Sequence, residues 1–129
     1  MSAERLLTTL RAQRLHWVQV QPGIDVQFRR PLEAELGRFA EGGVTVEHVC
    51  DFVTGWRGVT ESTLLGATVG SSDAAEFTAE LWSEFVRDRL DVVRSVAAAI
   101  AEAVSAHLAS KAAIAKNSEP FSTPSTASS

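Results

Sequence analysis

The segment Asp51-Phe52-Val53-Thr54-Gly55-Trp56-Arg57-Gly58-Val59-Thr60-Glu61-Ser62-Thr63-Leu64-Leu65 decides how the rest of this chain is arranged. Two glycines bracket its tryptophan, and an apolar stretch precedes them. Because glycine adopts the left-handed conformation that ends many helices, we expect a helix that runs to Thr54 and stops at Gly55. The indole of Trp56 then folds back onto the last helical turn. We interpret the segment first as a packing device.

The residues before these glycines predict an α-helix over 46–54. Thr45 is a favourable N-cap, and Glu47 places a negative charge in the first turn, where it is stabilising. The inward face is apolar and consists of Val46, Val49, Cys50 and Val53. We expect Cys50 to be a small buried hydrophobic residue, because no base is spaced to activate it as a nucleophile. His48 is expected to face solvent.

Upstream, residues 15–30 predict a β-hairpin, because apolar and polar residues alternate on both sides of Pro22-Gly23. A two-residue loop would place Val20 opposite Asp25 and mix apolar with charged side chains on one face, so this register is rejected. An odd loop length keeps the faces separate, and both three and five residues satisfy it. The three-residue loop gives the pairs Val20 with Ile24, Val18 with Val26 and His16 with Phe28.

The remaining periodicities are helical. Ser2 caps a short helix within residues 1–14, whose Leu6, Leu7 and Leu10 share a face. This segment is either a docking arm for a partner or a loosely packed chain end. Further helices are predicted over 32–40, which two glycines end, over 78–88, which Thr78 caps, and over 90–115. Residues 60–73 predict an irregular loop that reaches the core through Leu64, Leu65 and Val69.

The expected architecture is therefore mainly α with one N-terminal β-hairpin, an α+β arrangement in which a small helical domain ends in a long C-terminal helix. The domain covers residues 15–116. Residues 117–129 contain two prolines and little apolar surface to bury, so they predict a disordered tail. The expected structural core consists of Val49, Val53, Trp56, Phe77, Trp82 and Phe85.

Composition limits the classes of partner. The net charge is −4, and the 12 basic residues form no stripe of the kind that nucleic-acid binding requires. The single cysteine forms no internal disulfide. We find no signal-peptide pattern and no run of about 18 uninterrupted apolar residues, so neither export nor a membrane span is expected. These features favour a cytoplasmic protein.

Catalytic chemistry is not expected either. The three histidines form no close metal-binding pair, and no nucleophile motif is present. Acidic residues at helical spacing are better explained as a solvated helix face than as an acid/base or metal cluster. They are Glu76, Glu80, Glu84, Asp88 and Asp91. We therefore predict a protein that is no enzyme and uses no cofactor or metal.

The end of the long helix is the candidate binding surface. From Ser105 to Ala115 its residues are largely alanine, with Leu108 and Ile114 among them. Small side chains allow another helix to approach closely, which favours a partner or self-association surface. An ordinary alanine-rich surface helix is the alternative. The candidate partner-binding residues are Val104, Leu108 and Ala112.

Several short motifs, taken in order, resemble the tail assembly chaperones of long-tailed bacteriophages and prophages. The resemblance covers about residues 15 to 118, and Gly-Trp-x-Gly-Val and Glu-Phe-Thr are its most specific parts. The motifs are Phe28-Arg29-Arg30-Pro31, Phe52-Val53-x-Gly55-Trp56-x-Gly58-Val59, Glu76-Phe77-Thr78 and Lys116-Asn117-Ser118.

This resemblance implies a small, mostly helical, non-enzymatic protein of the bacterial host cytoplasm. Such proteins act on the tape measure protein and keep it soluble until tail tube protein polymerises around it. They are usually absent from the finished virion, and in many relatives a frameshifted longer form engages tube subunits. The implied partners are thus the tape measure protein and the tail tube protein, with a homo-oligomer left open. Two alternatives remain: a virion tail-completion or connector subunit, and a small regulatory protein of a mobile element.

Overall fold

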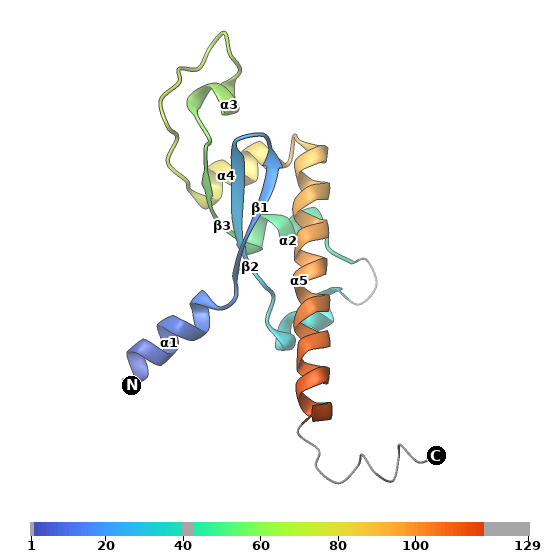
Figure 1. Ribbon diagram of the computed structural model, residues 1–129. Helices are drawn as coiled ribbons and strands as arrows, with labels where there is room; N and C mark the ends of the chain where they lie inside the picture. Colours follow the sequence, from blue (N-terminus) through green and yellow to red (C-terminus); the bar gives the residue numbers. More distant parts are fainter. Residues whose placement is uncertain (1, 40–42, 118–129) are drawn as a thin grey trace.

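A three-stranded antiparallel sheet with helices packed beside it forms the protein (Figure 1). The computed structural model describes residues 2–39 and 43–117. The elements are α1 (Ala3–Ala12), β1 (Leu15–Gln21), β2 (Ile24–Arg29), the 3-10 helix η1 (Glu33–Phe39), α2 (Val46–Phe52), β3 (Val53–Arg57), α3 (Glu61–Leu65), α4 (Ala79–Val86) and α5 (Leu90–Asn117). The α+β class and the long C-terminal helix are confirmed. The fold is mixed rather than mainly α, because a third strand turns the expected hairpin into a sheet.

That third strand is the main correction to the sequence interpretation. The helix predicted over 46–54 ends at Phe52, and the chain passes directly into β3. Strand β3 pairs with β2, so that Trp56 lies opposite Val26. Gly55 lies inside the strand and does not end the helix. The left-handed glycine is Gly58, with φ +82°, just after β3.

The hairpin has the expected register along most of its length. Val18 pairs with Val26 and His16 with Phe28. At the tip, however, Gln21 pairs with Ile24, and the register shifts between Gln19 and Gln21. The prediction of an odd loop is therefore wrong. A β-bulge takes up the extra residue, which allows a two-residue turn without moving charged side chains onto the apolar face.

The core lies between one face of the sheet and helices α2, α4 and α5. Helix α5 packs against β1, α2 and α4, and α2 packs against α4. Ten buried side chains form one cluster: Val26, Phe28, Val49, Phe52, Val53, Trp82, Val86, Val92, Val96 and Ile100. Of the six expected core residues, Val49, Val53 and Trp82 are in this cluster, and the aromatic rings of Trp56, Phe77 and Phe85 pack around it half-buried. The indole N–H of Trp82 donates to the Val49 carbonyl at 3.1 Å.

The opposite face of the sheet carries polar residues and one exposed tryptophan. The Arg57 guanidinium donates to Asp25 at 2.9 Å and lies 4.1 Å from the ring centre of Trp17. Trp17 is 43% exposed. The sheet therefore has one apolar and one solvated face, as alternation along each strand requires.

For the other helices, the predicted first residues agree with the structure better than the predicted last residues do. The Thr78 side chain accepts from the Leu81 backbone N–H, so α4 begins as expected and ends at Val86. Helix α5 extends to Asn117 rather than 115. The expected helix over 32–40 is a 3-10 helix instead. Its predicted end in residues 40–42 and the predicted disorder of the tail from 118 lie outside the described residues.

Residues 60–73 are more regular than predicted. Thr60 caps the short helix α3. It also pairs with Ala74 in an isolated β-bridge, so the two ends of the segment lie together and the residues between them form an excursion, a long loop that leaves the sheet. Figure 1 shows this excursion extending away from the rest of the molecule. Leu65 and Val69 are exposed, so the expected contacts of these two residues with the core are wrong.

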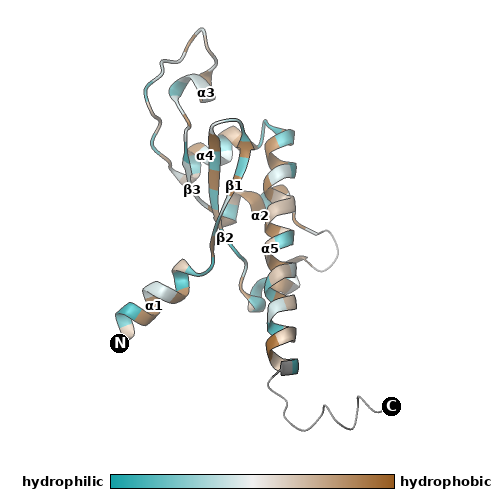
Figure 2. Cartoon of the chain, in the orientation of Figure 1, coloured by the Kyte–Doolittle hydropathy of each residue, from teal (hydrophilic) through white to brown (hydrophobic). Residues whose placement is uncertain are grey.

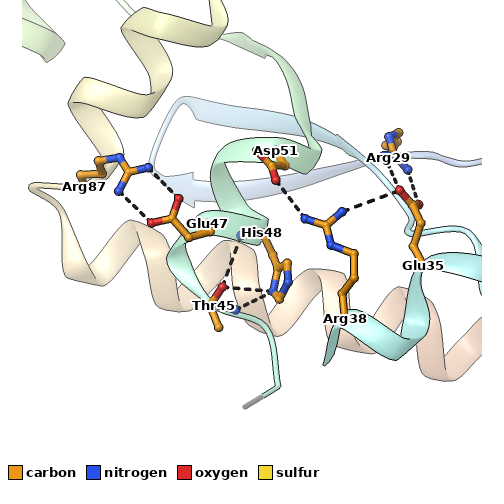
Figure 3. A network of polar contacts seen from close by, with 8 residues as sticks. All are labelled: Arg29, Glu35, Arg38, Thr45, Glu47, His48, Asp51 and Arg87. Atoms are coloured by element: carbon orange, nitrogen blue, oxygen red, sulfur yellow. Dashed lines mark hydrogen bonds and ion pairs between the residues drawn. The ribbon is translucent and has the colours of Figure 1, made fainter. Parts of the chain in front are cut away.

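His48 was expected to face solvent but is only 7% exposed. Its Nδ1 accepts from the Thr45 N–H at 3.0 Å, while the Thr45 hydroxyl accepts from the His48 N–H, which completes a capping box at the start of α2 (Figure 3). The ring also lies 4.2 Å from that of Phe39. This histidine is therefore a structural cap, and the general preference of histidine for the surface did not apply.

A chain of ion pairs ties η1 to the end of α2 (Figure 3). Arg29 donates to both carboxylate oxygens of Glu35, at 2.8 and 3.0 Å, and the Leu32 N–H donates to Glu35 at 2.8 Å. Arg38 continues the chain to Asp51 at 3.1 Å. The hydrogen bond from Arg29 is the largest of the causes that lower the pKa of Glu35 to about 2.

Replacing Glu35 with glutamine is expected to lower the free energy of unfolding at pH 7 by about 1–2 kcal/mol. The folded-state pKa of about 2 lies below the ordinary value of 4.5. The carboxylate therefore stabilises the fold fully above about pH 5, and this contribution is lost as the pH falls toward 2. Urea unfolding of both proteins at several pH values measures the difference, which should shrink below pH 4.5.

The matched control is Glu76→Gln, because Glu76 is exposed and makes no ion pair with any residue that the structure describes. Its stability should equal that of the unchanged chain at every pH. A pH-independent loss in Glu35→Gln would contradict the assigned role of the carboxylate charge.

Candidate protein-interaction surface

The distal part of α5, residues 104–116, leaves the core and runs past the sheet (Figure 1). Val92, Val96 and Ile100 are buried on earlier turns. Beyond them Leu108 is 42% exposed and Ile114 is 65% exposed. Figure 2 shows apolar residues continuing along the helix to its end. Distal α5 therefore presents apolar and small side chains to solvent.

The three candidate residues on this helix occupy two different settings. Val104 is half-buried and borders an apolar hollow of about 280 Å³. Leu108 and Ala112 follow at one and two turns beyond, on the exposed part. The hollow is lined by Leu36, Phe39, Gly43, Val44, Ile100, Ala101 and Val104. The structure thus places Val104 at the inner end of an apolar strip and Leu108 with Ala112 farther out.

An ion-pair cluster holds η1 against distal α5. The Glu33 carboxylate accepts from the Lys111 ammonium at 2.8 Å and pairs with the His107 ring at 2.8 Å. The hydrogen bond from Lys111, followed by that from His107, lowers the pKa of Glu33. This side of the helix therefore contacts η1, and the exposed Leu108 and Ile114 lie elsewhere on distal α5.

Helix α1 forms a second uncovered surface. It is capped as predicted, because the Ser2 side chain accepts from the Arg5 N–H at 3.2 Å. None of its residues is buried, and Leu6, Leu7 and Leu10 are 46–49% exposed. Figure 1 shows the helix projecting away from the sheet. The sequence left a docking arm and a loose chain end as alternatives, and the structure has a regular helix with an uncovered leucine face.

Sequence reasoning missed a third feature, which we name the arginine groove. It is a hollow of about 480 Å³ between the α1–β1 junction and α5. Its lining residues are Leu10, Gln13, Arg14, His16, Arg30, Ala103, Ala106, His107 and Ser110. The groove brings together two basic side chains that are distant in the sequence.

His16 and Cys50, two of the titratable side chains, pack against other side chains of the fold. His16 stacks on Phe28 with ring centres 5.4 Å apart, and Cys50 is half-buried beside the core. Within residues 2–39 and 43–117, no group of three His, Cys, Asp or Glu side chains could hold a metal ion.

Helix α5 meets a looser membrane criterion than the uninterrupted apolar run that the sequence lacks. Residues Leu90–Lys116 form a helix that could cross a bilayer by length and composition alone, with a mean hydropathy of 1.4 over its most apolar window. Core helices of soluble proteins, which are mostly buried, meet this criterion as well, whereas 17% of this window is buried in the protein. One face of α5 is buried in the protein core, and Glu102 and Lys111 lie within the helix.

Comparisons with known protein families, with curated proteins and with solved structures return no match for this chain.

Proposed function

We propose that this protein is a phage tail assembly chaperone that binds the tape measure protein and keeps it soluble and competent for tail tube assembly. The observation that carries the proposal is the uncovered apolar surface of distal α5, where Leu108 and Ile114 face solvent. The ordered motifs around Trp56 and Phe77 supply the resemblance to such chaperones. The leucine face of α1 adds a second surface of the same kind.

The physical argument concerns what a chaperone for a long helical client needs. Exposed apolar surface marks sites of protein association. A helical client segment can lie against distal α5, because the small side chains around Leu108 and Ala112 let two backbones approach closely. Each contact is small, but repeated sites along one client would add avidity. Two separate apolar surfaces, on α1 and on α5, suit a client of this length.

The proposal also sets where the protein acts. It works in the cytoplasm of the bacterial host by reversible binding, without a cofactor, and leaves before the virion is complete. Its partners are the tape measure protein and, through a longer frameshifted form of the kind that many such chaperones have, the tail tube protein. A homo-oligomer is compatible with the same surfaces. Persistence of the chain in purified particles would favour a tail-completion or connector subunit instead.

A double substitution on distal α5 tests the proposal. Leu108→Asp with Ala112→Asp is expected to weaken client binding about tenfold or more, because each carboxylate must be desolvated in an apolar contact. The chain is coexpressed with the tape measure protein of the same phage or prophage. The soluble fraction of the tape measure protein, measured after centrifugation, should fall.

The control is Leu90→Asp with Ala98→Asp. It changes the same residue types on the same helix at exposed positions nearer its start. This control should keep the tape measure protein as soluble as the unchanged chain does. Equal solubility with both double variants would refute the assignment to distal α5, and an insoluble client with the unchanged chain would refute the proposed function.

A further inference from the structure

The lining of the arginine groove contains two arginines and no acidic side chain. Five arginines each pair with a carboxylate: Arg29, Arg38, Arg57, Arg87 and Arg89. The other five arginines, Arg5, Arg11, Arg14, Arg30 and Arg94, form no ion pair with any residue that the structure describes. Of these five, Arg14 and Arg30 lie together. Both line the same hollow. A protein of net charge −4 therefore carries a local excess of positive charge here.

The backbone fixes these two arginines next to each other. Arg14 precedes β1 and Arg30 follows β2, and the Arg30 N–H donates to the Arg14 carbonyl at 2.7 Å. The Arg30 guanidinium donates to the Pro31 carbonyl at 2.8 Å. Burial, followed by the charge of Arg14, lowers the pKa of Arg30, and the charge of Glu33 opposes this shift without cancelling it. The two like charges thus lie close together in a partly desolvated place, where an anion would be stabilised.

The other wall of the groove is small and largely apolar. Helix α5 contributes Ala103, Ala106 and Ser110, and α1 contributes Leu10. The nearby Glu33 carboxylate acts on Arg30 through its charge, but its hydrogen bonds go to His107 and Lys111 and it forms no ion pair with either arginine. The volume of about 480 Å³ falls within the range of about 300–1,000 Å³ that ligand sites occupy.

We propose that the arginine groove binds an acidic segment of a partner polypeptide. A carboxylate of the segment pairs with Arg14 and Arg30, and apolar side chains next to it lie against Ala103, Ala106 and Leu10. Arginine suits this role, because its planar guanidinium donates two parallel hydrogen bonds to a carboxylate. The apolar wall and the pair of charges favour a peptide over nucleic acid, which requires a longer row of phosphate contacts.

The inference deepens the proposed function, and it rests on that function only for the identity of the partner. If the client is the tape measure protein, the segment held in the groove is one in which carboxylates interrupt an apolar helix face. Because the net charge of the chain repels acidic partners at long range, the local charge of the groove would contribute selectivity for such segments.

The test uses two fluorescein-labelled peptides and the full chain. One peptide repeats Ala-Glu-Ala-Leu and the other repeats Ala-Lys-Ala-Leu, and fluorescence anisotropy measures the binding of each. The glutamate peptide is expected to bind, and the lysine peptide is not. Arg14→Gln with Arg30→Gln should weaken binding of the glutamate peptide about tenfold or more, since two charge-assisted pairs are lost.

The matched control is Arg5→Gln with Arg94→Gln. These two arginines also have no carboxylate partner among the described residues, but they lie outside the groove. The control removes the same charge and should change binding less than twofold. Urea unfolding of both double variants verifies that they remain folded. Equal weakening in both, or equal binding of both peptides, would overturn the inference.

The coexpression assay separates this inference from the proposed function. Arginine-dependent binding of the glutamate peptide, together with an insoluble tape measure protein, would refute the function and leave the groove as a site. A tape measure protein kept soluble, together with peptide binding that does not depend on Arg14 and Arg30, would refute the groove and leave the function in place.

Discussion

Replacing Trp82 with alanine is expected to lower the free energy of unfolding by about 3–5 kcal/mol. The Trp82 side chain is fully buried, and it is the largest side chain of the core cluster. Its removal leaves a cavity between α4 and α2 that the packed surroundings cannot fill. It also leaves the Val49 carbonyl without its indole donor. Urea unfolding followed by circular dichroism measures the change independently of tryptophan fluorescence.

The conservative variant Trp82→Phe separates the two contributions. Phenylalanine retains most of the apolar volume but cannot donate to Val49, so a smaller loss of about 1–3 kcal/mol is expected. If Trp82→Ala costs no more than Trp82→Phe, the cavity argument is wrong and the hydrogen bond accounts for the whole effect.

Gly58→Ala is the second large change, with an expected loss of about 2–5 kcal/mol. Gly58 has φ +82°, a conformation that costs about 1–2 kcal/mol for residues with a side chain. In addition, a Cβ there would overlap the carbonyl oxygen of Gly23 in the hairpin turn. This contact is with backbone, so the turn itself must move, at a cost of about 1–3 kcal/mol. Urea unfolding measures the sum.

Gly23→Ala provides the matched control. Gly23 has nearly the same φ, +81°, but a Cβ at this position would meet nothing within 4 Å. It should therefore cost only the conformational part, about 1–2 kcal/mol. Equal losses for the two variants would show that the approach of the hairpin turn to the end of β3 is loose.

The parts of the fold that sequence predicted well are those fixed by local periodicity. Apolar spacing placed α5, and a threonine hydroxyl placed the start of α4. The third strand was missed because the apolar spacing of α2 runs on through Val53. What decides β3 is a distant partner: the free edge of β2 pairs with Val53, Gly55 and Trp56. Such pairing is absent from any local window of sequence.

The candidate site was also predicted only in part: its helical surfaces follow from local sequence, whereas the arginine groove depends on residues far apart in the chain. Distal α5 was identified from its composition, and α1 from its leucine spacing, although the sequence left the meaning of both open. The arginine groove was missed, yet a signal for it was present. The register that pairs His16 with Phe28 also sets Arg14 beside Arg30 when it is extended by two residues. Extending a predicted strand pairing beyond the strand ends would have found them.

The three tryptophans lie in three different environments, which gives the molecule built-in optical reporters. Trp17 is partly exposed to solvent, and the Arg57 guanidinium lies over its ring. The Trp56 indole N–H donates to the Ala75 carbonyl at 2.8 Å, and Trp82 is fully buried. The chain contains no tyrosine. Emission excited at wavelengths that phenylalanine does not absorb therefore comes from these indoles alone, and a water-soluble quencher is expected to reach them in the order of their exposure. Quenching of Trp17 should report the solvated sheet face, while Trp82, which is fully buried, is expected to emit at shorter wavelength and to report the integrity of the interior.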